Sequence, residues 1–435
     1  MTSSPENSTL TRLEKKNLGR ISSAEFLWGF KGGLVAPSTV LTLLLLDLGA
    51  GTGSVGVVSA IEGGAILFPQ IFGAYLFRRR RPTKQVLILW HVLSVVPLLC
   101  LMGLLLQSCA TQNPATTRVG LLLCFGGIQM VMGIVVPAWI EWLSHIFAPR
   151  TRGVVLGAIL SSAAGGGILG ALLAGQLIRL DPRPEAYARH YFLAGIIAAI
   201  AMAIFMAVQS RSSEIEVDAV ADENGSPLER QSLRDWLRWS ARDGNMRAFL
   251  AGRVLTIFGF SVLPFLAAHF TMPTAGGLSK SFIVSCGAVQ FLGMALSQVC
   301  VGRLGDGRGH RLGLIIAAGL QVLTLLILLS GSGALFCLLV YLGVGAAVGS
   351  AKIAELNLLI ETCPHQSRTA HIAVGNLMLG AAMITAPLLA GVVVGRWGLP
   401  ALFAASLAFS MAGVLWLLRR FQEPRQWRPT TVPSL

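Results

Sequence analysis

Two long apolar segments of the sequence are joined by Gly302-Arg303-Leu304-Gly305-Asp306-Gly307-Arg308-Gly309-His310-Arg311. Glycines permit a tight turn because they lack the Cβ that restricts other residues. Arginines hold such a turn among anionic headgroups on the cytoplasmic face of a membrane. A carboxylate there is satisfied by a neighbouring arginine or by the amides of a helix N-terminus. We predict a tight basic loop between two membrane helices; the alternative interpretation is a solvated basic hairpin.

The composition identifies the class of protein. Of the 435 residues, 54% are hydrophobic and only 12% are charged, and the mean hydropathy is +0.69. A water-soluble domain would need more polar surface than this. The apolar runs admit about 12 spans of roughly 20 residues, the length that crosses a bilayer. We therefore predict an all-α integral membrane protein, and we expect no signal peptide in the polar segment Met1 to Ser23.

The positive charge is distributed in a way that predicts orientation. The net charge is +14, but the basic residues fall in alternate loops and form no single patch, so we expect no nucleic acid partner. Loops on one side, with both termini, hold roughly 25 lysines and arginines against roughly 6 on the other side, which predicts that the first side is cytoplasmic. We expect a multi-pass protein of the inner membrane with both termini in the cytoplasm.

The predicted spans form two groups of six. The first group lies at about 24–46, 54–77, 85–106, 119–144, 153–178 and 191–209, and the second at about 246–270, 280–301, 312–329, 334–360, 369–394 and 400–418. The predicted organisation is a cytoplasmic N-terminal segment 1–23, a six-helix bundle 24–209, a linker 210–245 with a possible interfacial helix, a six-helix bundle 246–418 and a tail 419–435. A simple polar tether is the alternative interpretation of the linker.

An internal repeat supports two related halves. Phe26-Leu27-Trp28-Gly29-Phe30-Lys31 aligns with Phe249-Leu250-Ala251-Gly252-Arg253 if one residue of slip is allowed. Two six-helix bundles around a central pathway would produce such a repeat.

On its motif and its repeat, the chain resembles the major facilitator superfamily of transporters. In that family Gly-x-Leu-small-Asp-basic-x-Gly-basic-basic joins helix 2 to helix 3 and, in weaker form, helix 8 to helix 9. The resemblance implies 12 transmembrane helices in two pseudo-symmetric bundles, with helices 1, 4, 7 and 10 lining the cavity. The corresponding first-half loop keeps a glycine and bases but has Phe77 in place of the aspartate. The predicted gating residues are Gly302, Gly305, Asp306, Arg308, Gly309, Arg311, Gly73, Arg78 and Arg79.

The fifth predicted span is rich in glycine. Its pattern is similar to the antiporter motif of drug-exporting members of the family, but the proline of that motif is absent. Small residues at this spacing let helices approach closely. We therefore predict close helix packing at Gly157, Gly165, Gly166, Gly167, Gly170 and Gly175.

Ionisable residues inside the predicted spans are the candidates for function, because each costs about 2.5–3.5 kcal/mol in hydrocarbon and needs a partner or a wet cavity. In one interpretation they form structural pairs, Lys31 with Glu141 or Glu62 and Arg253 with Glu355. In the other, Lys31 and Arg253 face each other across the pseudo-twofold axis as a cationic cradle for an anionic group; snorkelling of both to the surface is a third possibility. The substrate-binding candidates are Lys31, Arg253, Glu141, Glu355 and Lys352, and the proton-coupling candidates are Glu62, Glu141 and Glu355.

Local sequence adds detail to three of these residues. Glu62 precedes Pro69, which we expect to bend its helix, and a carboxylate in hydrocarbon favours its protonated form and suits a proton carrier. Lys352 and Glu355 are three residues apart and are expected on one helix face. Glu361, at a helix end, is interpreted as a surface charge.

Other chemistries find little support. The seven cysteines form no Cys-x-x-Cys motif, and we predict neither a metal site nor a cofactor. Because there is no nucleotide-binding loop and no paired-carboxylate or Ser-His-Asp arrangement, we do not expect an ATP-driven pump or an enzyme.

We predict a secondary active transporter that moves a small organic solute, anionic or zwitterionic, by alternating access with proton coupling. Its expected partners are that solute and the lipid bilayer, and a monomer is expected. The alternatives are a multidrug/proton antiporter and a transporter-like sensor or assembly factor that does not transport.

Overall fold

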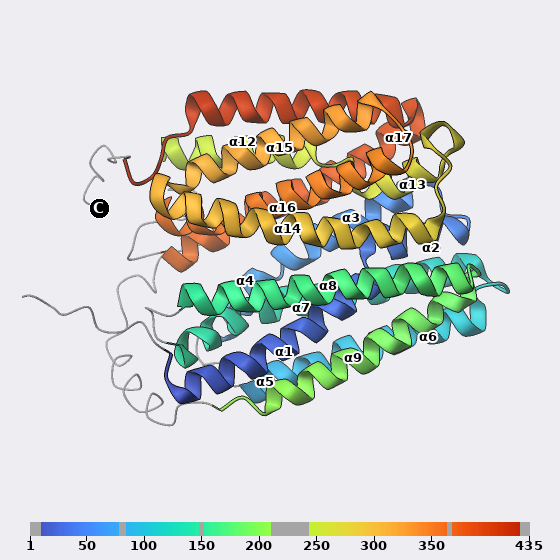
Figure 1. The fold of residues 1–435 in the computed structure, drawn as a ribbon, viewed down its shortest axis with the longest axis horizontal. Coiled ribbons are helices and arrows are strands. Elements are labelled where there is room, and N and C mark those ends of the chain that lie inside the picture. The colour runs from blue at the N-terminus through green and yellow to red at the C-terminus, as the bar shows by residue number, and fades with distance from the viewer. Residues whose placement is uncertain (1–9, 78–83, 148–151, 210–242, 363–367, 427–435) are drawn as a thin grey trace, which may run out of the picture. The chain divides into compact units, whose positions relative to one another are not determined.

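The computed structural model describes residues 10–77, 84–147, 152–209, 243–362 and 368–426, and these residues form helices and the turns that join them (Figure 1). Ten helical segments in this part of the chain are long and apolar enough to cross a membrane. One of them, 375–420, contains a break, and the apolar helix Thr52–Leu67 is shorter than the others. The all-α membrane class is confirmed, while the number of twelve spans and the two six-helix bundles stay predictions.

The chain divides into two compact units, each described here by itself. The first comprises Met1–Gly49, Pro69–Ser226 and Lys280–Ala288, and the second Ala50–Phe68, Pro227–Ser279 and Val289–Leu435. The helices of the first unit are α1 Arg12–Leu34, α2 Thr42–Asp47, α4 Gln70–Phe77, α5 Lys84–Trp90, α6 Val96–Cys109, α7 Pro114–Ile146, α8 Arg152–Leu180 and α9 Ala188–Met206. Those of the second are α3 Thr52–Leu67, α12 Gly244–Gly259, α13 Leu266–Thr271, α15 His310–Ser330, α16 Ala334–Thr362 and α17 Arg368–Arg420, whereas α14 Lys280–Arg308 begins in the first unit and continues in the second.

Helix α1 begins well before the predicted start at Ala24. Thr11 and Glu14 form a capping box, in which the Glu14 amide donates to the Thr11 hydroxyl at 3.2 Å and the Glu14 carboxylate accepts from the Thr11 amide at 2.9 Å. This motif satisfies amides that the first helical turn would otherwise leave unpaired. The helix is therefore already formed in the polar segment that precedes the apolar run.

Prolines and glycines interrupt several of the predicted spans. The predicted helix 54–77 is divided between α3 and α4 at Phe68 and Pro69, as expected from that proline. The predicted span 246–270 falls within one candidate membrane span, Gly244–Thr271, but its helix is interrupted: α12 ends at Gly259, and a 3₁₀ turn over Leu263–Phe265 contains Pro264, which has no amide hydrogen to continue an α-helix. The last two predicted spans meet at Gly398, whose φ of 79° breaks the helical backbone inside α17.

Helices α1 and α8 approach each other closely at small residues. A Cβ added at Gly166 or Gly170 would overlap the backbone of Phe26 or Phe30, and one added at Gly29 or Gly33 would overlap the α8 backbone. In lipid, helices gain most from such close approach, because a bilayer supplies no hydrophobic drive between them. The predicted packing role of Gly166 and Gly170 is confirmed. Gly157 differs, since nothing lies within 4 Å of an added Cβ there.

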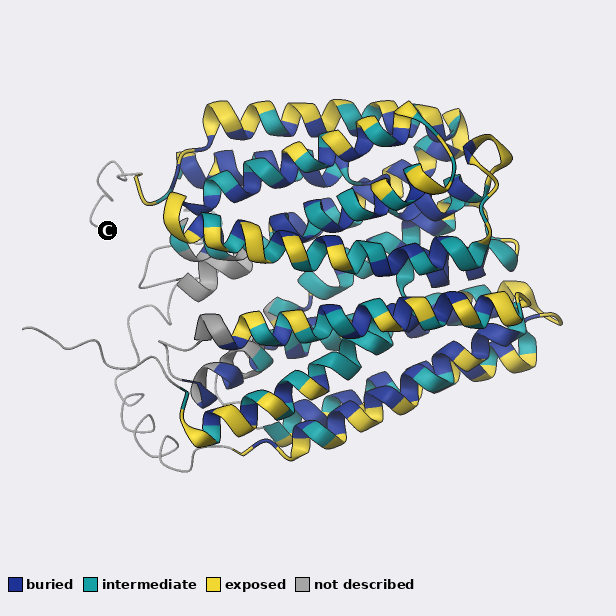
Figure 2. Ribbon diagram, viewed as in Figure 1, coloured by how far each residue is buried: buried dark blue, intermediate teal, exposed yellow. Residues whose placement is uncertain are grey.

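The packing of each unit separates buried helix faces from exposed ones. Figure 2 shows buried residues on the faces that helices turn toward their neighbours and exposed residues along the outer faces. A cluster of the first unit is built around Ile21, Trp142, Phe147 and Phe205, and a cluster of the second around Phe249, Leu358 and Phe421. Large apolar side chains such as Leu123 and Leu180 are exposed on the outside, as expected for surfaces that face lipid.

Gly166→Ala and Gly157→Ala add the same methyl group to the same helix, so they isolate the effect of the close contact. Gly166→Ala must push α1 away from α8 and is expected to lower stability by about 1–3 kcal/mol. Gly157→Ala is expected to leave stability unchanged or to raise it by up to about 1 kcal/mol. Thermal unfolding of the purified protein in detergent measures both. Equal effects of the two variants would contradict the close-contact interpretation.

Candidate functional site

Arg253 and Glu355 form an ion pair inside the second unit. Arg253 lies on α12 and Glu355 on α16, and the Arg253 Nε and Nη2 lie 2.8 and 2.5 Å from the same Glu355 oxygen, Oε2. Only 9% of the Arg253 side chain and 16% of the Glu355 side chain is exposed. The Arg253 Nη1 also donates to the Thr256 hydroxyl at 2.9 Å. Of the predicted pairings, the one between Arg253 and Glu355 is therefore present.

A buried polar network holds the end of α12 next to this pair. The Gln321 amide on α15 donates to the Thr256 carbonyl at 2.9 Å and to the Ser410 hydroxyl on α17 at 2.6 Å. Ser410 in turn donates to the Ser406 carbonyl at 2.7 Å. Because α12 ends at Gly259, these bonds tie its last turn to two other helices just before the break.

Lys31 lies on α1 in the first unit, with its Nζ 3.9 Å from the centroid of the Trp28 ring. The rings of Trp28 and His91 meet edge to face, with their centroids 5.1 Å apart. The His91 Nδ1 lies 2.7 Å from the Leu87 carbonyl oxygen. A cation over an aromatic ring is stabilised by the negative face of the ring. Glu25, on the same helix, is close enough to interact electrostatically with Lys31.

The remaining predicted residues are less fully defined. Glu62 lies on α3 and is half-buried, and Lys352 is exposed on α16, three residues before Glu355. Glu141 lies on α7, but its side chain is outside the described residues. Lys31 and Arg253 belong to different units, so their predicted position across a pseudo-twofold axis stays a prediction, as do the roles in substrate binding and proton coupling.

The predicted loop between Gly302 and Arg311 is largely helical. Helix α14 continues through Gly302, Gly305, Asp306 and Arg308, and α15 begins at His310, so Gly309 with a φ of 92° is the one residue between them. The prediction of a glycine-rich loop was wrong because a glycine inside a helix keeps its backbone hydrogen bonds, and a single left-handed residue suffices to reverse the chain. Gly305 has a packing role instead, because an added Cβ would overlap His310.

The turn between α14 and α15 contacts residues near the C-terminus, and local sequence did not predict these contacts. Glu423 accepts a hydrogen bond from the Arg311 amide at 3.0 Å, at the start of α15. The Arg311 side chain donates to the Phe421 carbonyl at 2.6 Å and the Leu418 carbonyl at 2.8 Å, at the end of α17. A carboxylate at a helix start and a guanidinium at a helix end both complement the helix dipoles. Asp306 was expected to be satisfied by a neighbouring arginine or by the amides of a helix N-terminus. In the structure Glu423 accepts from the amide at the start of α15 instead, and 81% of the Asp306 side chain is exposed.

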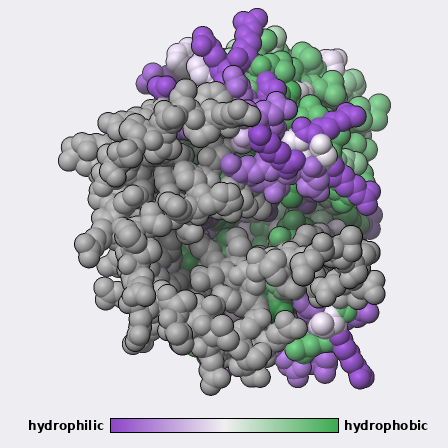
Figure 3. Space-filling model, turned by 90° about the vertical axis from the view of Figure 1, so that its left-hand side faces the viewer, coloured by the Kyte–Doolittle hydropathy of each residue, from purple (hydrophilic) through white to green (hydrophobic). Residues whose placement is uncertain are grey.

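Arg425 binds the same junction. It donates to Glu361 at 2.7 and 3.1 Å and to the Asp306 carbonyl at 3.0 Å, and the hydrogen bonds to Glu361 raise the pKa of Arg425. Glu361 lies at the end of α16, as predicted, and forms an ion pair there with the partly exposed Arg425. Figure 3 faces the end at which α14 meets α15, and hydrophilic side chains gather there beside atoms drawn in grey. Arg78 and Arg79 lie outside the described residues, while Gly73 is buried in α4 against the backbone of Ile134.

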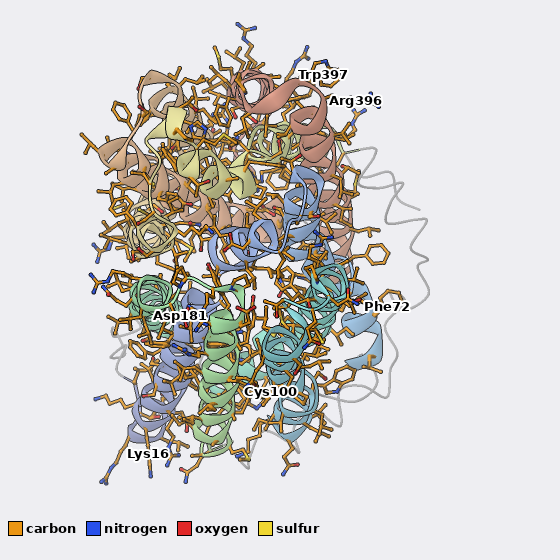
Figure 4. All side chains as sticks on the ribbon, turned by 90° about the vertical axis from the view of Figure 1, so that its right-hand side faces the viewer. Lys16, Phe72, Cys100, Asp181, Arg396 and Trp397 are labelled. Carbon is orange, nitrogen blue, oxygen red and sulfur yellow. The ribbon has the colours of Figure 1, made fainter. Side chains whose placement is uncertain are left out.

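Charged groups also pair where α2 ends and where α8 ends, both in the first unit. Lys280, the first residue of α14, forms an ion pair with Asp47. Arg183 donates two hydrogen bonds to Asp181 at 2.9 Å, and these bonds lower the pKa of Asp181 to about 2. Asp181, which follows the end of α8, is labelled in Figure 4. Within the described residues there is no group of three or more His, Cys, Asp or Glu side chains that could hold a metal ion.

Comparison with known proteins agrees with this architecture. Residues 248–434 match the family model described as Major Facilitator Superfamily, whereas no curated protein matches the sequence significantly. A mutant of the nucleoside transporter NupG has a TM-score of 0.70 at 12% identity, over 93% of this chain and 100% of that one. An inward-facing, unoccupied bacterial homolog of the human lysosomal transporter Spinster has a TM-score of 0.67 at 15% identity, over 97% and 100% of the two chains.

A third similar structure is a POT family transporter in complex with 5-aminolevulinic acid, with a TM-score of 0.66 at 12% identity over 93% of this chain and 95% of that one. These identities show a common fold only. The family's sequence pattern lies in the C-terminal part, and the fold of nearly the whole length is that of solved transporters. The chain is thus similar to the Major Facilitator Superfamily in sequence over residues 248–434 and to solved transporters in fold over nearly its whole length.

Proposed function

We propose that this chain is a secondary active transporter that moves a small organic anion or zwitterion across the membrane by alternating access, coupled to protons. The Arg253–Glu355 pair is the observation that carries the proposal. A nearly buried guanidinium in a membrane helix requires an anion beside it. Glu355 supplies that anion here, and a substrate carboxylate or phosphate has the chemistry to take its place.

Exchange of the partner of Arg253 provides a route to proton coupling. When Glu355 is protonated, its attraction for Arg253 weakens and the guanidinium is left with an uncompensated charge. An anionic substrate then binds Arg253 with charge-assisted hydrogen bonds. Release of the proton restores the Arg253–Glu355 pair and displaces the substrate. Proton and anion thus bind together and leave together, which is the requirement for symport.

The chemistry of some structural neighbours is consistent with this proposal. One neighbour binds 5-aminolevulinic acid, which carries a carboxylate and an amine, and another binds a peptide conjugate. For such a zwitterion, Arg253 suits the carboxylate. In the first unit, Lys31 above Trp28 is a second cation for an anionic group, and Glu62 and Glu141 stay candidates for proton transfer.

The membrane topology belongs to the same proposal. We place both termini in the cytoplasm and the protein in the inner membrane, on the distribution of arginine and lysine. The bundles 24–209 and 246–418, joined by 210–245, are proposed as the two bodies that move, and the monomer as the working unit. The multidrug alternative loses its support, because Gly166 and Gly170 are accounted for by the packing of α1 on α8.

Ligand-induced stabilisation tests the substrate class. We expect one or more carboxylate-bearing solutes, from a panel of monocarboxylates, amino acids, dipeptides, nucleosides and lipophilic cations, to raise the apparent melting temperature of the detergent-purified protein by a few degrees at about 100 times Kd. Arg253→Ala is expected to abolish the shift, whereas Arg183→Ala, which removes an exposed arginine, keeps it. Stabilisation by lipophilic cations alone would overturn the proposal.

Glu355→Gln tests the coupling, because it imitates the protonated carboxyl group. We expect the variant to bind the solute identified above, because the neutral side chain no longer competes with the solute for Arg253. In proteoliposomes it should still exchange labelled for unlabelled solute, but a proton gradient should no longer drive accumulation. Lys352→Gln, on the same helix, serves as the control for the loss of a nearby charge. Accumulation at the wild-type level in Glu355→Gln would exclude Glu355 as the coupling residue.

A double-mutant cycle measures how strongly the pair stabilises the fold. Removing one partner of a buried ion pair costs about 3–5 kcal/mol, because it leaves the other charge uncompensated. We therefore expect Arg253→Ala/Glu355→Ala to be more stable than either single variant in denaturant unfolding. The same cycle on the exposed pair Arg183 and Asp181 should show much weaker coupling. Additive effects of Arg253→Ala and Glu355→Ala would show that the two side chains do not interact in solution.

A further inference from the structure

A second candidate site lies in the first unit, where α1, α8 and α9 meet. A cavity of about 450 Å³ is present there, within the range of sites that bind small molecules. The Ser22 hydroxyl in its wall is buried and has no hydrogen-bond partner among the described residues. A buried hydroxyl without a partner is costly, and a polar ligand group would satisfy it. The lining residues are Ser22, Ser23, Phe26, Leu27, Ser162 and Ile204.

The depth of this cavity in the membrane follows from the length of the first span. The candidate span Arg12–Asp47 has 36 residues, more than the roughly 20 that cross a bilayer, and its helix is interrupted at Val35 and Ala36. Its excess length lies at the Arg12 end, because the bases are there and the apolar residues follow. The hydrocarbon therefore begins beyond these bases, toward the apolar part of α1. Ser22 and Ser23 lie on the side of these bases, whereas Ser162 lies deeper, because its neighbour Ala163 contacts Gly29 of α1.

Positive charges surround the headgroup side of the cavity. The exposed residues of α1 recur at helical spacing and form one stripe, Arg12, Lys15, Lys16, Gly19 and Ser23. The stripe leads from the bases to the serines of the cavity, and Figure 4 shows Lys16 pointing away from the helices. Arg20 is anchored beside it, since its Nη1 donates to the Ala207 carbonyl where α9 ends. Of the two acidic residues on α1, Glu14 is buried in the cap of the helix, and Glu25, two residues after Ser23, interacts electrostatically with Lys31.

The same corner of the unit is held in a fixed arrangement. The Asn17 and Gln209 groups exchange two hydrogen bonds of 2.8 and 3.0 Å between α1 and the segment after α9. Lys84 donates to the Met206 and Val208 carbonyls at 2.9 and 2.7 Å. The bases and the serines therefore keep their spacing without a bound ligand, which reduces the entropy lost on binding.

An apolar surface continues from the cavity along α9. Ile196, Ile200 and Met206 are 57%, 48% and 55% exposed and follow one face of that helix, next to Ile204 in the cavity wall. In a membrane, such a face lies against acyl chains. A ligand with a phosphate at the bases, oxygen atoms at the serines and a hydrocarbon chain along this face would match all three parts of the site.

We propose that this cavity binds one anionic phospholipid. Lys16 and Arg20 hold its phosphate, the hydroxyl of Ser22 faces an ester oxygen, and an acyl chain lies against Phe26 and Ile204. This site is separate from the Arg253–Glu355 pair and does not depend on the transport proposal.

Native mass spectrometry of the full-length protein in detergent tests this site, with phosphatidylglycerol and phosphatidylcholine titrated separately. Each base near the membrane surface is worth about 1 kcal/mol, so Lys16→Gln/Arg20→Gln should weaken the tightest phosphatidylglycerol binding by about 30-fold. Arg396→Gln/Arg419→Gln, which removes two exposed arginines elsewhere, should leave it unchanged. Ser162→Leu, which fills the cavity and keeps the bases, should also weaken it. Melting temperatures without lipid verify that each variant is folded.

Three results would overturn the assignment. The first is equal affinity of the wild-type protein for phosphatidylglycerol and phosphatidylcholine. The second is wild-type affinity in Ser162→Leu, which would reduce the site to unspecific attraction between bases and anionic lipid. The third is stabilisation of the protein by inorganic phosphate as large as that by phosphatidylglycerol, which would show that no lipid chain is needed.

Discussion

An ionised side chain within a bilayer must have a partner, and the second unit depends on this constraint at Arg253. The guanidinium is almost completely buried, so removal of Glu355 alone would leave its charge uncompensated between α12 and α16. Thr256 takes a further N–H of the same guanidinium, and the carbonyl of Thr256 is held by Gln321. One charged group thereby sets the relative position of three helices.

Close backbone contact complements this polar constraint. Lipid tails are as apolar as leucine side chains, so apolar burial alone does not join helices in a membrane. In the first unit α1 and α8 meet through Gly29, Gly33, Gly166 and Gly170, and in the second unit α3 meets α17 through Gly56 and Gly64. Where the chain has no charge to pair, the absence of a Cβ lets dispersion contacts and backbone dipoles act at short range.

Much of this arrangement could be predicted from local sequence, and the parts that could not have identifiable causes. Apolar length predicted the spans, Pro69 predicted the break before α4, and charge in hydrocarbon singled out Arg253 and Glu355. The start of α1 was missed although Thr11 and Glu14 form a legible capping box, and the break in α12 was missed although Pro264 marks it. The contacts of Glu423 with Arg311 and of Arg425 with Glu361 join positions far apart in the chain, and no local pattern carries that information.

The break in α12 gives the Arg253–Glu355 pair a mechanical context. Arg253 lies less than two turns before Gly259, where the helix ends, and the Thr256 carbonyl accepts hydrogen bonds from both Phe260 and Gln321. Rotation of the last turn of α12 would strain these bonds and move the backbone that carries Arg253. If Arg253 exchanged its partner, its hydrogen bond to the Thr256 hydroxyl would transmit the movement to the last turn of α12. The charge pair therefore lies next to an interrupted helix, and Thr256 joins the two features through its hydroxyl and its carbonyl.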